Sequence, residues 1–170
     1  MDLAPLLIWL KLIHVLGAFG LVLAHGASVA VAFKLRGERD RIRIQALVEL
    51  SNAYLNAFYL ALLVVLIAGI LAGIAGGYWT DGRLWLWASV VVFLATMIGM
   101  YGLASPYFEA VRHALGVATF NDLRKGLDPP PPLEEGELAV LLASPRPIYI
   151  AALGFGGVAL LVYLMVVKPF

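Results

Sequence analysis

WLKLIHVLGAFGLVLAH, residues 9–25, carries one charged side chain and two of the three histidines in the chain. An apolar run of this kind is typical of a helix that crosses the hydrocarbon core of a membrane, which takes about 20 mostly apolar residues. His14 and His25 are eleven residues apart, about three helical turns, so they project from nearly the same face, roughly 16 Å apart along the axis. Gly17 lies on that face too, which leaves room beside His14 for a second helix or a flat ligand.

The composition of the chain points to a membrane protein. Of its 170 residues, 62% are hydrophobic and 14% are charged, whereas the apolar share of a soluble domain is nearer half. The lipid bilayer is therefore the first expected partner. Because the sequence contains no cysteine, disulfides and thiolate metal sites are excluded, and a haem or a metal ion would have to use histidine. The basic residues do not form a patch with interleaved aromatic residues, so we expect no nucleic-acid partner.

Four apolar runs are long enough to span a bilayer, at about residues 5–33, 46–76, 84–111 and 147–167. The first connecting stretch, residues 34–43, carries five basic residues. Because basic residues concentrate in cytoplasmic loops, this stretch and the long loop 116–146 are predicted to face the cytoplasm. We therefore expect one all-α domain over residues 1–170: an up-down bundle of four transmembrane helices with both termini outside.

Two features of the spans predict how they pack. Gly69, Gly73 and Gly77 are spaced by four and form a small-residue stripe that allows close approach between helices. We expect such faces to support a homo-oligomer or the place of the chain in a larger membrane complex. Pro106 lies inside the third span and lacks a backbone N–H group, so a kink is predicted near residues 102–106.

The long loop 116–146 contains two segments with recognisable character. Residues 129–132 are four consecutive prolines and predict a stiff polyproline segment. Residues 138–142, LAVLL, form a short apolar patch, which is expected to lie either on the membrane surface or against the bundle.

A set of polar residues occurs near the predicted cytoplasmic ends of the second and third spans: Glu49, Asn52, Asn56, Glu109 and Arg112. Polar and charged groups within spans are costly in hydrocarbon and tend to face the bundle interior, where they find a partner. Two interpretations are open. The set forms either a salt-bridge and hydrogen-bond network that holds the bundle together, or a cytoplasmic gate or ligand vestibule.

Several motifs occur together along the chain: Trp9-x-Lys11-x-x-His14 with a glycine-rich continuation, a basic first loop, Gly69 and Gly73 before an aromatic turn, and the ending MVVKP at residues 165–169. With these motifs the chain resembles a family of bacterial predicted integral membrane proteins catalogued as domain of unknown function 2269. The resemblance covers nearly the whole chain and implies the four-helix fold and a place in the bacterial cytoplasmic (inner) membrane. The family has no settled biochemical activity, so the resemblance implies no reaction.

The opening helix alone is also similar to those of two neighbouring groups, the copper-resistance D-type membrane proteins and the haem-containing bacterial membrane protoporphyrinogen oxidase. In the oxidase, the histidine of a Trp-x-Lys-x-x-His-type opening is a haem ligand. The resemblance therefore implies that His14 is a haem ligand here, with Lys11 as its neighbour. The third span departs from the oxidase pattern, because Trp85 and Trp87 lead into ASVVVF, residues 88–93, where the oxidase has a lysine.

Haem ligation by two histidines of one chain requires both at a similar depth. With the inner membrane boundary placed at Phe33 and Arg112, His25 lies roughly 12 Å inside it, whereas His113 lies at the surface. A haem b would therefore be five-coordinate, use a different second ligand or sit between two copies of the chain. The same separation argues against a metal site made of His25, His113 and Glu109, and we expect none.

Three functional hypotheses follow. The leading one is an accessory or ligand-binding membrane protein whose face with His14 and His25, flanked by Lys11 and Gly17, binds a planar cofactor or a lipid-like ligand. The second is a b-type haem redox protein related to the oxidase, and the third is a small oligomeric permease or channel. The chain lacks a glycine-rich phosphate loop, a nucleophile elbow and a paired-carboxylate motif, which excludes a soluble-type hydrolase or kinase. Whether the protein is an enzyme stays open.

Overall fold

The computed structural model describes residues 4–170, and its elements in chain order are η1 (Ala4–Leu6), α1 (Leu7–Leu35), α2 (Arg41–Ala75), α3 (Leu84–Ala114), α4 (Phe120–Lys125), α5 (Glu135–Leu142) and α6 (Arg146–Val167). Four of these helices, α1, α2, α3 and α6, are long and apolar enough to cross a membrane. The predicted all-α, multi-pass membrane fold is therefore confirmed.

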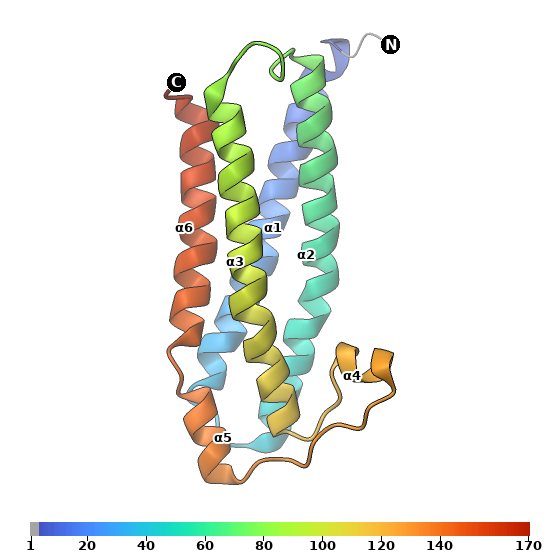
Figure 1. Cartoon of the computed structure of the whole chain (residues 1–170), viewed down its shortest axis with the longest axis vertical. Coiled ribbons are helices and arrows are strands. Elements are labelled where there is room, and N and C mark those ends of the chain that lie inside the picture. The colour runs from blue at the N-terminus through green and yellow to red at the C-terminus, as the bar shows by residue number, and fades with distance from the viewer. Residues whose placement is uncertain (1–3) are drawn as a thin grey trace.

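The four long helices run alternately up and down beside one another (Figure 1). Both termini lie at one end of the bundle, together with the turn between α2 and α3. The loop between α1 and α2 lies at the opposite end, as does α5. We call these the terminal end and the loop end. The basic stretch 34–43 is thus separated from the termini by the length of the bundle.

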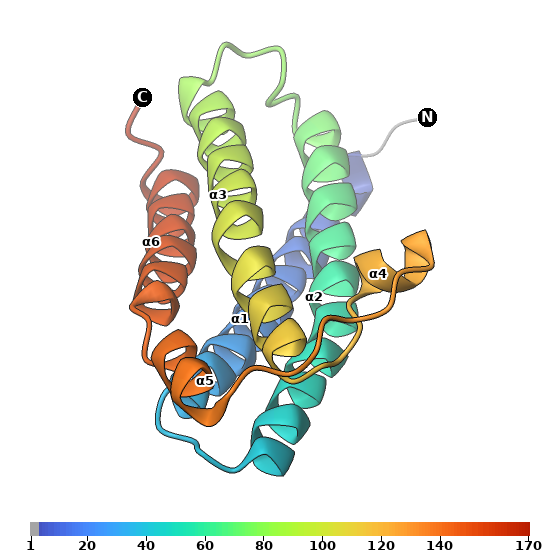
Figure 2. The same cartoon turned by 60° about the horizontal axis from the view of Figure 1, so that its bottom comes forward.

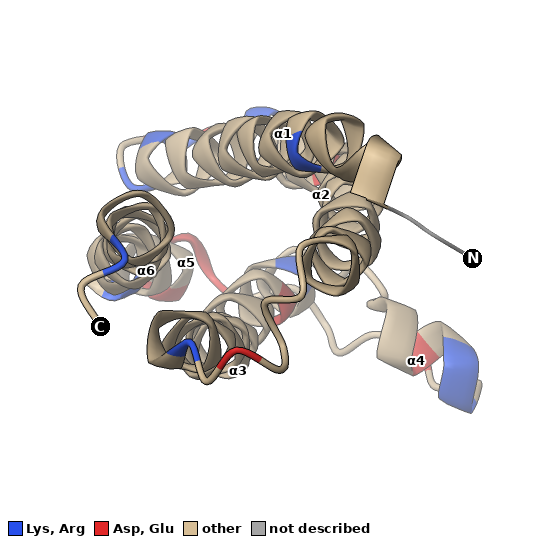
Figure 3. Ribbon diagram, turned by 90° about the horizontal axis from the view of Figure 1, so that it is seen from above, with Lys and Arg blue, Asp and Glu red and all other residues tan. Residues whose placement is uncertain are grey.

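The long helices pack as two antiparallel pairs. α1 lies along α2 and α3 lies along α6, while α2 and α3 contact each other only sparsely. Small residues allow the first pair to pack closely, because Gly17 lies against Val65 and Gly20 against Ala61. Seen from above, α1 crosses the back of the bundle from α2 at the terminal end towards α6 (Figure 3). One face of α1 therefore meets different neighbours along its length.

The most deeply buried apolar side chains lie near the loop end. Leu35, Ile44, Val111 and Leu142 are fully enclosed where the ends of α1, α2 and α3 meet α5. α5 closes this end of the bundle (Figure 2), and its Leu138 also packs into the core. The apolar patch at residues 138–142 therefore lies against the bundle. Along the long helices many large apolar side chains are exposed, as expected where helices face lipid rather than water.

Two helix boundaries and one short helix differ from the sequence prediction. α2 begins at Arg41 rather than near residue 46, because the Asp40 side chain accepts a hydrogen bond from the Ile42 N–H group at 2.9 Å and caps the helix. α3 contains Pro106, as the predicted span does, and ends at Ala114 rather than near residue 111. α4 was not predicted. Its first turn is held by the capping box described below, and Gly126 ends it with a φ of 65°.

The glycine stripe of α2 is filled by side chains of the same molecule. A Cβ atom on Gly69 would lie 2.9 Å from the His14 ring, and one on Gly73 would overlap the indole of Trp79. Gly77 lies beyond the helix, with a φ of 66° that suits glycine in the turn. The stripe therefore serves the packing of this single chain, and an oligomer would have to use another face.

Candidate functional site

His14 is held by α2. Its Nδ1 atom lies 2.8 Å from the backbone oxygen of Val65. Because a carbonyl oxygen only accepts, Nδ1 carries the hydrogen, and Nε2 of the neutral ring keeps a free lone pair. The ring fits beside α2 because Gly69 has no side chain at this position. His14 is thus a half-buried group with a fixed orientation and one available nitrogen.

Lys11 and Gly17, the two residues that flank the histidines on the predicted cofactor face, each contact another part of the chain. The Lys11 ammonium lies 5.5 Å from the centre of the Tyr78 ring, and its interaction with the phenol lowers the pKa of Tyr78, a residue in the turn outside the spans. Gly17 is buried, with Val64 and Val65 of α2 directly against it. The low surface beside His14 is therefore occupied by a helix.

His25 is surrounded differently. Its side chain is only 6% exposed, and its Nε2 atom is buried without any hydrogen-bond partner. The ring lies directly against α6, since a Cβ atom on Gly154 would overlap the imidazole at its Nε2 atom. The edge of the Phe155 ring packs against it, with ring centres 5.0 Å apart. A polar nitrogen is thus enclosed by apolar groups, which is unusual in folded proteins.

A small cavity of about 40 Å³ adjoins this histidine, and all four long helices contribute to its wall. α1 supplies Leu21 and His25, and the other lining residues are Phe58, Thr96, Met97, Met100, Gly154 and Val158. The Thr96 hydroxyl donates to the Val92 carbonyl at 2.8 Å, so its oxygen can still accept. The cavity wall is therefore largely apolar, and the side chains of His25, Thr96 and two methionines contribute to it.

The two histidines of α1 do not form one site. His14 contacts α2, whereas His25 contacts α6. Their shared face, predicted from the spacing, is divided because α1 crosses from one neighbour to the other. A single flat ligand spanning both rings would have to displace part of this packing.

The predicted polar set is also divided. Glu49 accepts a hydrogen bond from Gln45 on its own helix, and Glu109 accepts one from Asn121 in α4 at 2.8 Å. Arg112 donates to the Ala118 carbonyl in the connection between α3 and α4. Within residues 4–170 no hydrogen bond or ion pair joins one member of the set to another. The remaining two members, both asparagines, are exposed on α2.

A polar group that the sequence analysis missed ties α4 to α3. Nε2 of His113 lies 2.7 Å from a carboxylate oxygen of Asp122, and the same oxygen accepts from the N–H and hydroxyl groups of Thr119. The hydrogen bonds from Thr119 and His113 hold the pKa of Asp122 well below its usual range. The capping pattern Thr119-x-x-Asp122, directly after a span, is the signal that could have revealed this group.

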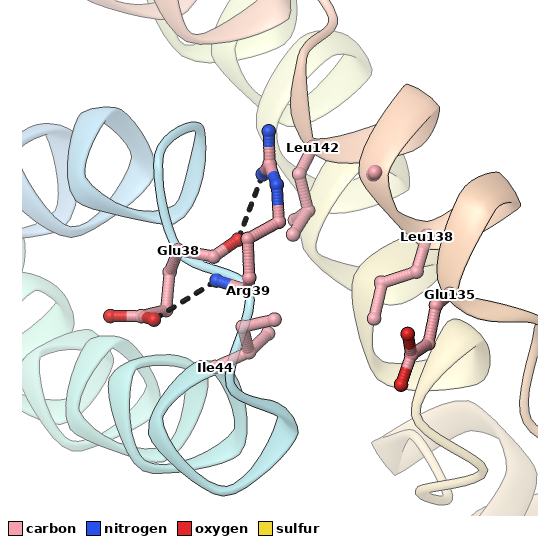
Figure 4. Close-up of a pocket in the computed structure, with 7 residues that line it drawn as sticks. Glu38, Arg39, Ile44, Glu135, Leu138 and Leu142 are labelled. Carbon is pink, nitrogen blue, oxygen red and sulfur yellow. Dashed lines mark hydrogen bonds between the residues drawn. The ribbon is translucent and has the colours of Figure 1, made fainter.

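Two further features lie at the loop end. A shallow pocket of about 50 Å³ separates the α1–α2 loop from α5, with Glu38 and Arg39 on one side and Glu135 and Leu138 on the other (Figure 4). The Glu38 carboxylate accepts from the N–H groups of Arg39 and Asp40, which lowers the pKa of Glu38. The charges around this pocket are therefore largely engaged with local groups.

Close to this end, three polar atoms are buried without a hydrogen-bond partner: Nε of Arg36, the hydroxyl of Tyr107 and the hydroxyl of Ser144. Arg36 donates from another nitrogen to the Ala143 carbonyl at 3.4 Å. These atoms come from the residue directly after α1, from α3 and from the turn before α6. None of the three residues lines either of the two pockets described above.

Comparison with known proteins adds no relative. The chain matches no protein-family model, no curated protein and no solved structure. In the part of the chain that the structure describes, no group of three or more histidine, aspartate or glutamate side chains is placed to hold a metal ion. The function must therefore be argued from the geometry of the bundle interior.

Proposed function

We propose that the chain is a ligand-binding protein of the bacterial cytoplasmic membrane and that Nε2 of His25 binds the ligand. The observation behind this proposal is the buried, unpaired Nε2 atom of a histidine that lines a cavity to which all four long helices contribute. Leaving such a group unpaired costs about 1–3 kcal/mol, and a ligand that pairs with it recovers that cost. The basic stretch 34–43 supports an orientation with the loop end in the cytoplasm.

The size and chemistry of the cavity limit the ligand. Its volume of about 40 Å³ suits one water molecule or one ion and is far too small for a porphyrin. An imidazole nitrogen together with the thioethers of Met97 and Met100 is a donor set that favours a soft metal ion such as Cu(I). We therefore propose a single soft cation as the ligand class, bound near the middle of the membrane.

The test uses Ag(I), a soft cation that does not change its oxidation state under these conditions. The detergent-purified protein is titrated calorimetrically, beside His25→Leu and His14→Leu variants. We expect about one equivalent to bind to the native chain and to His14→Leu, and none to bind to His25→Leu with comparable affinity. Equal binding by native protein and His25→Leu would overturn the proposal.

The geometry at His14 favours a second candidate function, binding of haem b in a redox protein. Donation from Nδ1 to a backbone carbonyl fixes the tautomer that leaves Nε2 for a metal, the usual arrangement of a ligating histidine. Absorption spectra of oxidised and dithionite-reduced protein, beside a His14→Ala variant, test it. A Soret band that the variant loses supports haem ligation by His14. A colourless protein after haem supplementation ends this hypothesis.

A further inference from the structure

α2 carries most of its polar side chains along one outward line. Starting in its second turn, residues spaced alternately by four and three are all exposed, and we call this line the α2 seam: Gln45, Glu49, Asn52, Asn56, Tyr59, Leu63, Leu66 and Ile70. Alternating steps of four and three form the heptad repeat through which two helices pack along their length. The seam thus has the spacing of a helix-pairing surface and no helix on it.

The seam faces away from the neighbour to which α2 is most closely packed. Val65 lies against Gly17 of α1. Asn56 precedes Val65 by nine residues, which places it roughly 180° around the helix. Neither α1 nor any other element of the chain covers Asn52 or Asn56, because both are exposed.

These two asparagines lie at membrane depth without a partner. Phe58, two residues after Asn56, lines the cavity of His25 near the middle of the helices. On the inner side of α2, by contrast, Ser51 shares a hydrogen bond with Ser28 of α1 at 3.1 Å. Within residues 4–170, the side-chain amides of Asn52 and Asn56 make no hydrogen bond. Since hydrocarbon offers no water to replace such bonds, an exposed amide there favours association with another polar helix.

We propose that the α2 seam binds the α2 seam of a second copy of this chain, giving a two-fold symmetric dimer within the membrane. An amide group both donates and accepts, so two identical amides satisfy each other. The basic loop gives both copies one orientation, and a two-fold axis along the membrane normal then sets Asn56 opposite Asn56 of the second copy. A single asparagine in a heptad seam fixes register in the same way.

The rest of the seam suits this occupant. Tyr59, Leu63 and Ile70 are 59%, 53% and 49% exposed and supply apolar contact towards the terminal end. Towards the loop end, Gln45 donates to Glu49 at 2.9 Å, close to the membrane surface, where water can solvate the carboxylates of two copies. The asparagines therefore lie between an apolar half and a hydrated half of the same surface.

The first test is cross-linking, which is simple because the chain has no cysteine. Leu63→Cys places a thiol on the seam, and Leu94→Cys places one on α3 at nearly equal exposure, 53% against 52%. In vesicles at a low protein-to-lipid ratio, oxidation should join Leu63→Cys into a disulfide dimer at least tenfold faster than Leu94→Cys. Equal rates for the two variants would overturn the proposal.

The second test removes the amides. The Asn52→Leu/Asn56→Leu double variant should weaken dimerisation about tenfold, measured by energy transfer between labelled copies as the protein is diluted in lipid. Tyr101→Leu, on the exposed surface of α3, is the matched control and should leave dimerisation unchanged. Thermal unfolding of the monomer in detergent shows whether each variant is folded. A double variant that is folded and dimerises like the native chain would exclude the seam as the contact.

Discussion

His14 and His25 lie on the same helix and nearly the same face, yet they lie in opposite environments. The ring of His14 donates a hydrogen bond to α2 and has space made for it by Gly69. The ring of His25 is enclosed by Gly154 and Phe155 of α6, and its Nε2 has no partner. The periodicity of α1 is the same at both histidines, but the neighbouring helix is not. The neighbouring helix therefore determines whether each ring finds a hydrogen-bond partner.

The largest expected effect comes from adding a side chain at the glycines that pack against the rings of His25 and His14. A Cβ atom on Gly154 would overlap His25, and one on Gly69 would approach His14 at 2.9 Å. Gly154→Ala should therefore destabilise the protein by about 1–3 kcal/mol, as overpacking does, and Gly69→Ala should cost less. Detergent-based unfolding of both variants under one set of conditions measures the difference.

A double variant provides the control for this prediction. In a His25→Ala background the ring is gone, so Gly154→Ala should lose most of its cost, which is the signature of coupled neighbours. If Gly154→Ala costs the same with and without the His25 ring, close packing between the two residues is not the cause.

A smaller expected effect concerns the hydrogen bonding of the two histidines. Replacing His14 and His25 by leucine should change the free energy of unfolding differently. His14→Leu removes a donor bonded to Val65 and should destabilise the ligand-free protein by about 0.5–1.5 kcal/mol. His25→Leu replaces an unpaired polar ring with an apolar side chain and should be neutral or stabilising. The measurement is the unfolding free energy of each variant in chelator-treated protein. A loss at His25 as large as that at His14 would mean that Nε2 of His25 is already satisfied.

Much of this fold could be predicted from composition and periodicity. The four spans follow from four apolar runs, because the length and apolar character of each run are local properties of the sequence. An even number of antiparallel spans then returns the chain to the end at which it starts. The division of the α1 face did not follow, since spacing places His14 and His25 together but says nothing of a crossing neighbour. Likewise the polar set was grouped by depth, whereas Glu109 and Arg112 find partners in the segment after α3.

The smallest expected effect extends the comparison to the third histidine, His113 at the end of α3, whose Nε2 atom has a partner in Asp122. Asp122 accepts from Thr119 and His113, and these bonds lower the pKa of its carboxyl group. A lowered pKa in the folded state means that the carboxylate contributes stability above its unfolded pKa of about 3.9 and loses that contribution as the pH falls further. Asp122→Asn should therefore loosen α4 at pH 7.

The measurement is hydrogen-exchange protection of the α4 backbone in native protein, Asp122→Asn and Asp81→Asn. Asp81 pairs with Arg83 at 2.9 Å in the turn at the terminal end, so its replacement controls for the loss of a carboxylate far from α4. We expect protection of α4 at pH 7 to fall severalfold in Asp122→Asn alone, with the difference from native protein shrinking below about pH 4. A difference that persists unchanged at pH 3 would show that the negative charge of Asp122 is not what stabilises α4.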